Sequence, residues 1–262
     1  MALLLLKLTL TPILIGCASL AARRWGPSIG GWLVALPLTS GPVALYLALD
    51  RGPAFAAGAA RGSIGGLLGD AAFALAYGWL ARRLDWPASL LGGGAAFVVA
   101  ALATTPILGA PALVVFVAVD VAMAVLLRLA PPATRARDPR PLPSWDIPAR
   151  MVVGTAVVLA VTEAAGFLGA QASGLLAAVP VYVSVLAVFA HHLEGPDQAL
   201  GVVRGLQVGL FGTTVFFLVV TTAIEPLGIA AAFAGALLAV AAVQSVSLRL
   251  LRRPISSTAS AP

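Results

Sequence analysis

The stretch Gly52-Pro-Ala-Phe-Ala-Ala-Gly-Ala-Ala-Arg-Gly-Ser-Ile-Gly-Gly-Leu67 decides the architecture, because it recurs later in the chain. At an offset of 143 residues, Gly195-Pro-Asp-Gln-Ala-Leu-Gly-Val-Val-Arg-Gly-Leu-Gln-Val-Gly-Leu210 repeats its Pro and Arg positions and every Gly position except Gly65. Upstream, Gly31-Trp-Leu-Val-Ala-Leu-Pro37 matches Gly174-Leu-Leu-Ala-Ala-Val-Pro180, so 13 of the 37 positions from 31 to 67 are identical. Low complexity does not supply matched Pro, Gly and Arg positions, and the chain therefore contains an internal repeat.

The composition identifies the chain as an integral membrane protein. Of its 262 residues 60% are hydrophobic and only 10% are charged, and the mean hydropathy is +1.02. A soluble domain is about 25% charged, so too few charges are present to cover a water-exposed surface. This excludes a soluble enzyme and a DNA-binding domain, and we expect no nucleic-acid partner. The single cysteine, Cys17, excludes an internal disulfide and a cysteine metal cluster.

Apolar stretches bounded by Pro, Gly or charge predict an all-α protein with nine transmembrane helices, since a spanning segment must satisfy its backbone groups internally. Residues 131–147 are rich in Pro and Arg and predict an extended, solvated linker, and residues 254–262 predict a disordered tail. The predicted spans are 3–22, 29–49, 54–81, 87–105, 112–130, 148–168, 172–192, 197–222 and 227–248.

The positive charges predict the orientation. With nine spans, 12 loop arginines fall on one side of the membrane, whereas Lys7 and Arg51 fall on the other. By the positive-inside rule the arginine-rich side is cytoplasmic. The linker and the C-terminus are therefore expected inside and the N-terminus outside. A count of eight spans, with the fourth and fifth fused, would place four of these arginines on the side opposite the linker and so break this bias.

Counting spans predicts how the two copies are related. The first repeat covers 1–108, a linker helix and loop cover 109–147, and the second repeat covers 148–253. Five spans separate equivalent elements, an odd number, so the copies have opposite topology. Inverted repeats are typical of secondary transporters. The alternative is a duplication that only builds a stable bundle, as in some channels and assembly subunits.

Two interrupted helices are the predicted substrate site. Pro37 and Pro180 lie near the middle of spans two and seven, where each should kink or break its helix. Unwound backbone at this depth lines a cavity or is buried in protein. The alternative is a pair of simple proline kinks. The hydroxyl-bearing neighbours that we include in the site are Thr39, Ser40, Tyr182 and Ser184.

Arg61 and Arg204 are the second pair of candidate substrate-binding residues. Each lies about seven residues into its helix, or roughly 10 Å along the axis. Intramembrane arginine is costly and by default indicates function. A guanidinium here could hold a phosphate or carboxylate with two hydrogen bonds. The alternative is a structural tie to backbone carbonyls or lipid phosphates.

Three acids inside predicted spans are candidates for proton coupling. Asp70, Asp120 and Glu163 have no counterparts at the offset of 143. A buried carboxylate can take up and release a proton. The alternative is that Asp70 or Asp120 neutralises Arg61 or Arg204.

The sequence gives no sign of an enzyme, a metal site or a cofactor. It contains no serine–histidine–acid set, no HExxH, no Walker loop and no GxGxxG after a strand. His191 and His192 are adjacent, so they point to different faces of a helix and predict a solvated helix end rather than a metal site.

The segment Gly174-Leu-Leu-Ala-Ala-Val-Pro180 with Ala190-His-His-Leu-Glu-Gly-Pro196 resembles the GlpM-like bacterial inner-membrane proteins. Those are about half as long, so each repeat resembles one such unit. The resemblance implies a multi-pass protein of the bacterial inner membrane, with a link to envelope polysaccharide. The first copy departs from the pattern, because Ala48 and Leu49 stand where the second has its two His.

These features together predict secondary transport of a small anionic or amphiphilic solute by alternating access. The alternatives are a flippase for lipid or lipid-linked glycan and a non-catalytic membrane subunit of an envelope assembly. Membrane lipids and the solute are the expected partners, and a homodimer is left open.

Topology gives the first test. A single cysteine placed in the linker of a Cys17→Ser variant should resist a membrane-impermeant maleimide in intact cells, because the arginine bias places the linker in the cytoplasm. Labelling in intact cells would overturn the orientation. It would also overturn the inverted repeat if the C-terminus proved to be inside.

Overall fold

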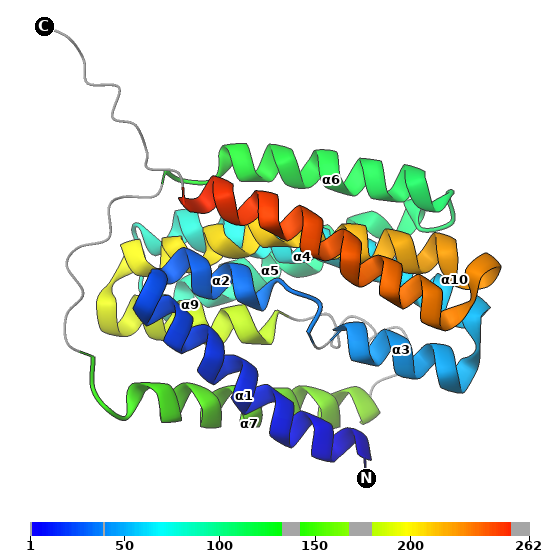
Figure 1. Ribbon diagram of the computed structural model, residues 1–262. Helices are drawn as coiled ribbons and strands as arrows, with labels where there is room; N and C mark the ends of the chain where they lie inside the picture. Colours follow the sequence, from blue (N-terminus) through cyan, green and yellow to red (C-terminus); the bar gives the residue numbers. More distant parts are fainter. Residues whose placement is uncertain (1, 39, 133–141, 168–179, 253–262) are drawn as a thin grey trace, which may run out of the picture.

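The computed structural model describes residues 2–38, 40–132, 142–167 and 180–252, and these residues form helices and no strand. The longer helices lie side by side and run back and forth along one direction (Figure 1). A short 3₁₀ turn, η1 (Thr105–Ile107), follows α5. The α-helices are α1 (Ala2–Trp25), α2 (Pro27–Val34), α3 (Ser40–Arg51), α4 (Pro53–Ala81), α5 (Trp86–Thr104), α6 (Ala112–Leu129), α7 (Asp146–Phe167), α9 (Val181–Glu194) and α10 (Pro196–Arg252).

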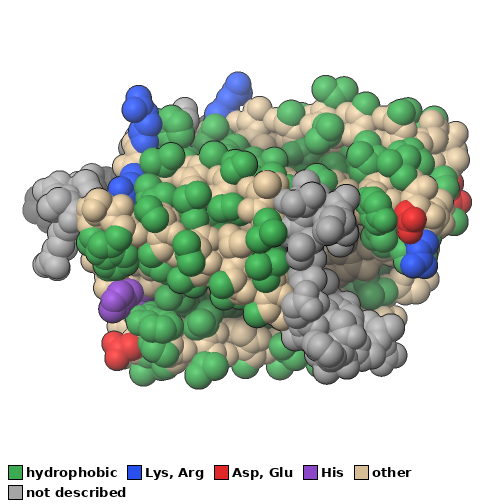
Figure 2. All heavy atoms as spheres, turned by 90° about the horizontal axis from the view of Figure 1, so that it is seen from below, with side chains coloured by type: hydrophobic (Ala, Val, Ile, Leu, Met, Phe, Trp, Pro, Cys, Tyr) green, Lys and Arg blue, Asp and Glu red, His purple; other side chains and the backbone are tan. Residues whose placement is uncertain are grey.

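The described helices are those of a membrane protein. Four segments, α4, α5 with η1, α6 and α10, are long and apolar enough to cross a bilayer. Large apolar side chains also face outward, with Leu91 75% and Leu238 73% exposed. Hydrophobic side chains spread across the face in Figure 2, while the charged ones it shows lie near the edges of the view. The predicted all-helical membrane class is confirmed, whereas the count of nine spans stays a prediction.

Helix α10 folds back on itself at Gly228, the one residue within it that has a non-helical backbone, with φ of 80°. We call residues 196–227 the first arm and residues 229–252 the second arm. The arms lie side by side. The Gln244 side chain of the second arm donates a hydrogen bond to the Gly209 carbonyl of the first arm at 2.8 Å. The turn falls close to the predicted boundary between 197–222 and 227–248.

Two repeated Gly-Pro pairs form the same kind of helix junction. Gly52 between α3 and α4 has φ of 88°, and Gly195 between α9 and α10 has φ of 103°. Only glycine adopts such angles without steric cost. The proline that follows each glycine takes the first helical position, where its missing N–H costs nothing.

Helix α2 packs against the first arm of α10 with almost no side chain between the backbones. A Cβ on Gly205 would collide with the Ser28 carbonyl, and a Cβ on Gly31 would collide with the Val202 carbonyl. Glycine is therefore required on both helices. Glycines also shape the contact between α4 and α5, but there side chains fill the space: the Phe97 ring packs over Gly69, and the Phe73 ring packs over Gly93.

The predicted segments 1–108 and 148–253 are interleaved in space. Helix α4 packs along α10, α2 also packs on α10, and α1 packs on α7. The core lies where these helices meet, and its largest fully buried side chains include Tyr77, Phe73 and Phe216. Helix α6, from the segment that joins the repeats, packs on α4 and α10 at one side of the bundle (Figure 1).

The glycine contacts predict a matched pair of variants. Gly205→Ala should destabilise the protein by about 1–3 kcal/mol, because the added methyl group forces α2 away from α10. Gly62→Ala at the matching position of α4 should be neutral or stabilising by up to about 1 kcal/mol, since alanine favours helix and nothing lies within 4 Å of the added Cβ. Thermal unfolding in detergent measures both, and equal effects would contradict the packing.

Candidate functional site

The chain is interrupted around Pro37, as the sequence predicts. Helix α2 ends at Val34 and α3 begins at Ser40, with Pro37 buried between them. Two of the backbone carbonyls at the interruption find partners. The Ala35 carbonyl accepts a hydrogen bond from the Thr213 hydroxyl, and the Pro37 carbonyl accepts one from the Gly41 N–H at 2.9 Å. This satisfies the requirement for an irregular segment inside a membrane protein. Thr39 lies outside the described residues.

The corresponding site in the second copy is described from Pro180 onward. Pro180 precedes the first residue of α9, and its carbonyl accepts a hydrogen bond from the Ser184 N–H at 3.0 Å. The segment before Pro180, which includes Gly174, lies outside the described residues. The Tyr182 and Thr11 hydroxyls are 3.0 Å apart and share a hydrogen bond, which links α9 to α1.

A small cavity brings the two proline sites together, and we call it the inner pocket. Its volume is about 50 Å³, and its surface is mostly apolar. Leu36 and Leu38, on either side of Pro37, line it together with Tyr182, two residues beyond Pro180. This volume holds a few water molecules but no larger solute. The remaining lining residues are Leu14, Cys17, Ala18, Leu33 and Val34.

A second, open depression lies on the outside of the bundle, between α2 and the second arm of α10. We call it the lateral groove; its volume is about 320 Å³. Leu36 lines it as well, so this side chain forms part of the wall of both cavities. The other lining residues are Trp32, Leu237, Val240, Ala241, Gln244, Ser245 and Leu248.

The polar groups beside the lateral groove bond to one another. The Trp32 indole N–H donates to the Ser247 hydroxyl at 2.8 Å, and that hydroxyl lies 2.7 Å from the Gln244 side-chain oxygen. The Gln244 amide in turn bonds to the Gly209 carbonyl. Because these groups are satisfied within the protein, the groove offers mainly apolar surface to an occupant.

The predicted arginines line neither cavity. Arg61 and Arg204 are both half-buried, and neither forms an ion pair with a described residue. One Arg61 terminal nitrogen donates to the Ala110 carbonyl at 3.4 Å, while its Nε atom is buried without a partner. The predicted neutralisation by Asp70 or Asp120 is therefore not present among the described residues.

The predicted coupling acids have different surroundings. One Asp120 oxygen accepts a hydrogen bond from the Thr214 hydroxyl at 3.1 Å, which links α6 to α10, and its other oxygen is buried without a partner. Asp70 also has one buried carboxylate oxygen without a partner. Glu163 lies on α7, but its side chain is outside the described part of the structure.

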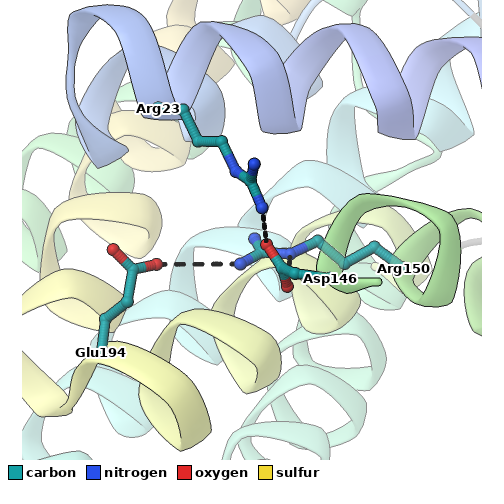
Figure 3. Close-up of polar contacts among 4 residues, drawn as sticks. All are labelled: Arg23, Asp146, Arg150 and Glu194. Carbon is teal, nitrogen blue, oxygen red and sulfur yellow. Dashed lines mark hydrogen bonds and ion pairs between the residues drawn. The ribbon is translucent and has the colours of Figure 1, made fainter. Parts of the chain in front are cut away.

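A buried charge cluster, which sequence reasoning missed, joins three helices (Figure 3). Asp146 lies between two arginines, at 2.8 Å from the Arg23 guanidinium and 2.7 Å from that of Arg150. Arg150 also lies 3.7 Å from the Glu194 carboxylate and stacks over the Phe189 ring. The side chains of Asp146 and Arg150 are 0% and 4% exposed. We call Arg23, Asp146, Arg150 and Glu194 the linker-end cluster.

The sequence could indicate one of the ion pairs in this cluster, but not the others. Asp146 and Arg150 are spaced i, i+4, which places them on one face of a helix. The interpretation of residues 131–147 as solvated linker hid Asp146, however, and α7 begins at that residue. The partners on α1 and α9 depend on tertiary packing, so spacing alone could not identify them.

The two histidines lie beside this end of the bundle. His191 Nδ1 is 3.3 Å from the Tyr77 hydroxyl, and the His192 ring meets Trp86 edge-on. They therefore face different neighbours, as predicted for adjacent helical residues. No group of three metal-ligating side chains occurs among the described residues.

Comparison of the chain with protein-family models, curated proteins and solved structures finds no match. The resemblance to GlpM-like proteins therefore stays a prediction.

The cluster predicts a large effect on stability. Asp146→Asn should destabilise the protein by about 3 kcal/mol, because it leaves two guanidinium groups facing each other in a buried site. Asp50→Asn is the control, since it removes an exposed pair with Arg51 that is worth less than about 1 kcal/mol. Unfolding of both variants in detergent measures the difference, and an equally small loss in both would contradict the cluster's burial.

Proposed function

We propose that this protein is a secondary transporter that moves a small amphiphilic anion across the membrane by alternating access between inverted repeats. The observation that carries the proposal is the position of the interruption at Pro37. The segment that contains it separates the inner pocket from the lateral groove, with Leu36 in the wall of both.

The lateral groove supports an amphiphilic solute. It is open on a side of the bundle where apolar residues such as Leu237 are exposed. An occupant could therefore enter from the lipid phase with its apolar part in the groove. The small inner pocket then corresponds to a closed state, which must widen before a solute passes Leu36.

The arginines support a negative charge on the solute. The Arg61 Nε atom is buried with no partner, and a half-buried guanidinium that has no acidic partner among the described residues favours an anion. Arg204 occupies the matching repeat position and would meet the same group from the other side of the membrane. Asp120, on the helix outside both repeats, is the acid that we propose exchanges a proton during the cycle, because one of its carboxylate oxygens is buried without a partner.

The helix bounds are compatible with repeated structure. Shifting α1 by 143 residues places it on α7, shifting α3 places it on α9, and shifting α5 places it on the second arm of α10. Both Gly-Pro junctions coincide as well. Two matched sets of helices are what alternating access between inverted repeats requires.

A lipid flippase is a second candidate, and the open side of the groove favours it. It differs from the first in its substrate, which would be a membrane lipid that moves without leaving the bilayer. A subunit of an envelope assembly would move neither class of molecule.

Groove filling tests the function. Ala241→Trp places an indole inside the lateral groove, whereas Ala242→Trp, the control, places one at an exposed neighbour that does not line it. Vesicles should carry fluorescent lysophosphatidylglycerol in the inner leaflet, and dithionite quenching measures its outward movement. Wild-type protein and the control should accelerate this movement. Ala241→Trp should be about tenfold slower, which corresponds to ~1.4 kcal/mol.

The labelled lipid separates the candidate functions. Movement of two-chain phosphatidylglycerol at a similar rate, in the absence of any ion gradient, would replace the transporter by the flippase. If neither lipid moves faster than in protein-free vesicles, both proposals fail and an assembly subunit is the remaining class.

A further inference from the structure

The linker-end cluster ties together the ends of three helices. Arg23 lies two residues before the end of α1, Asp146 is the first residue of α7, and Glu194 is the last residue of α9. Figure 3 shows Arg23 and Arg150 both reaching Asp146, with Glu194 on the other side of Arg150. One carboxylate therefore holds α1 against α7, and one guanidinium extends the contact to α9.

Two of these helices also form the walls of the inner pocket. Cys17 and Ala18 line the pocket from α1, and Tyr182 lines it from α9. Cys17 lies six residues before Arg23, or about 9 Å along the helix, and Tyr182 lies twelve residues before Glu194, or about 18 Å. Separation of α1 from α7 and α9 at the cluster would therefore open the pocket toward this end of the bundle.

The chemistry of the cluster suits two discrete states. Burying charges is expensive, and the cost is met only while every charge has its partner at close range. In an open state the same groups would be solvated by water instead. Arg23 is the member suited to this exchange, because its side chain is 34% exposed and can turn to water while the fully buried Asp146 keeps its ion pair with Arg150.

The repeat makes the cluster one-sided. At the offset of 143, the positions that correspond to Asp146, Arg150 and Glu194 hold Leu3, Lys7 and Arg51. The first copy thus lacks the acids that would build a matching cluster. At that opposite end, the described residues include an ion pair between the neighbours Asp50 and Arg51, which is exposed. An internally repeated protein with buried ion pairs at one end favours the state that is closed at that end.

We propose that the linker-end cluster is a latch that closes the inner pocket at the end where α7 begins, and that this latch breaks and re-forms in each transport cycle. This inference rests on the proposed function, because a latch needs an alternating protein. Arg23 is its moving part, while Asp146 and Arg150 stay paired on α7.

Ala18→Cys in a Cys17→Ser background gives a direct readout, because Ala18 lines the pocket and is only 3% exposed, whereas Cys17 is already exposed. The experiment measures the rate at which a membrane-impermeant maleimide modifies the cysteine introduced by Ala18→Cys in sealed vesicles, from the side on which a linker cysteine is labelled. Arg23→Gln should raise this rate about fivefold, the population shift that follows loss of one partly exposed ion pair. Arg23→Lys, which keeps the charge, should stay within about twofold of wild type.

Arg24→Gln is the matched control, because Arg24 is the exposed neighbour of Arg23 and stacks over Trp25 instead of joining the cluster. Its rate should equal that of wild type. Asp146→Asn should raise the rate further, and if it does not fold, Arg23→Gln alone decides. Equal rates for folded Arg23→Gln and Arg24→Gln proteins overturn the latch, as does an increase confined to the opposite side.

The labelling assay needs no substrate, so it separates the latch from the proposed function. Lipid movement with no response of the labelling rate to Arg23→Gln overturns the latch alone. A response of the labelling rate without lipid movement supports an opening at this end while the proposed substrate fails.

Discussion

The backbone contact between α2 and the first arm of α10 is the constraint on which the site depends. Gly31 and Gly205 leave no room for a Cβ, so the two helices meet carbonyl against Cα. Small residues permit such an approach where helices have no water to exclude. The contact fixes α2 on α10, and the Thr213 hydroxyl then reaches the Ala35 carbonyl, where the chain leaves the helix. Pro37 interrupts the helix, and the glycine packing fixes where this interruption lies against α10.

The same contact creates the groove. Helix α2 has only eight residues, so it covers a limited length of α10 and leaves a depression beside the second arm. The polar side chains near this depression, Trp32 and Gln244, are bound within the protein. In a lipid environment such internal pairing removes the cost of unsatisfied polar groups. What remains at the surface is the mainly apolar lining of the lateral groove.

Sequence reasoning predicted the features that depend on local chemistry. Matched glycines and prolines predicted the junctions at Gly52 and Gly195 and the interruption at Pro37, because φ angles and missing N–H groups are properties of single residues. It did not predict the partners of polar groups across helices. Asp146 was assigned to a solvated linker although it is fully buried, because its burial is set by α1 and α9, which lie far away in the chain. Neither Arg61 nor Arg204 lines either of the two cavities. The sequence could not predict this, because a periodic pattern indicates the face of a helix on which a residue lies but not which helix packs against that face.

The two copies of the sequence repeat differ in charge. The repeated positions are mostly Gly, Pro and apolar residues, which set the helix paths, whereas the acids at positions 120, 146 and 194 have no acidic counterpart at the offset. Mutations of repeated glycines should therefore act on folding where the glycine is closely packed, as at Gly205. Changes to these acids and their partners should instead act on how the helices are held together, because each acid bonds one helix to another: Asp120 joins α6 to α10, and Asp146 joins α7 to α1.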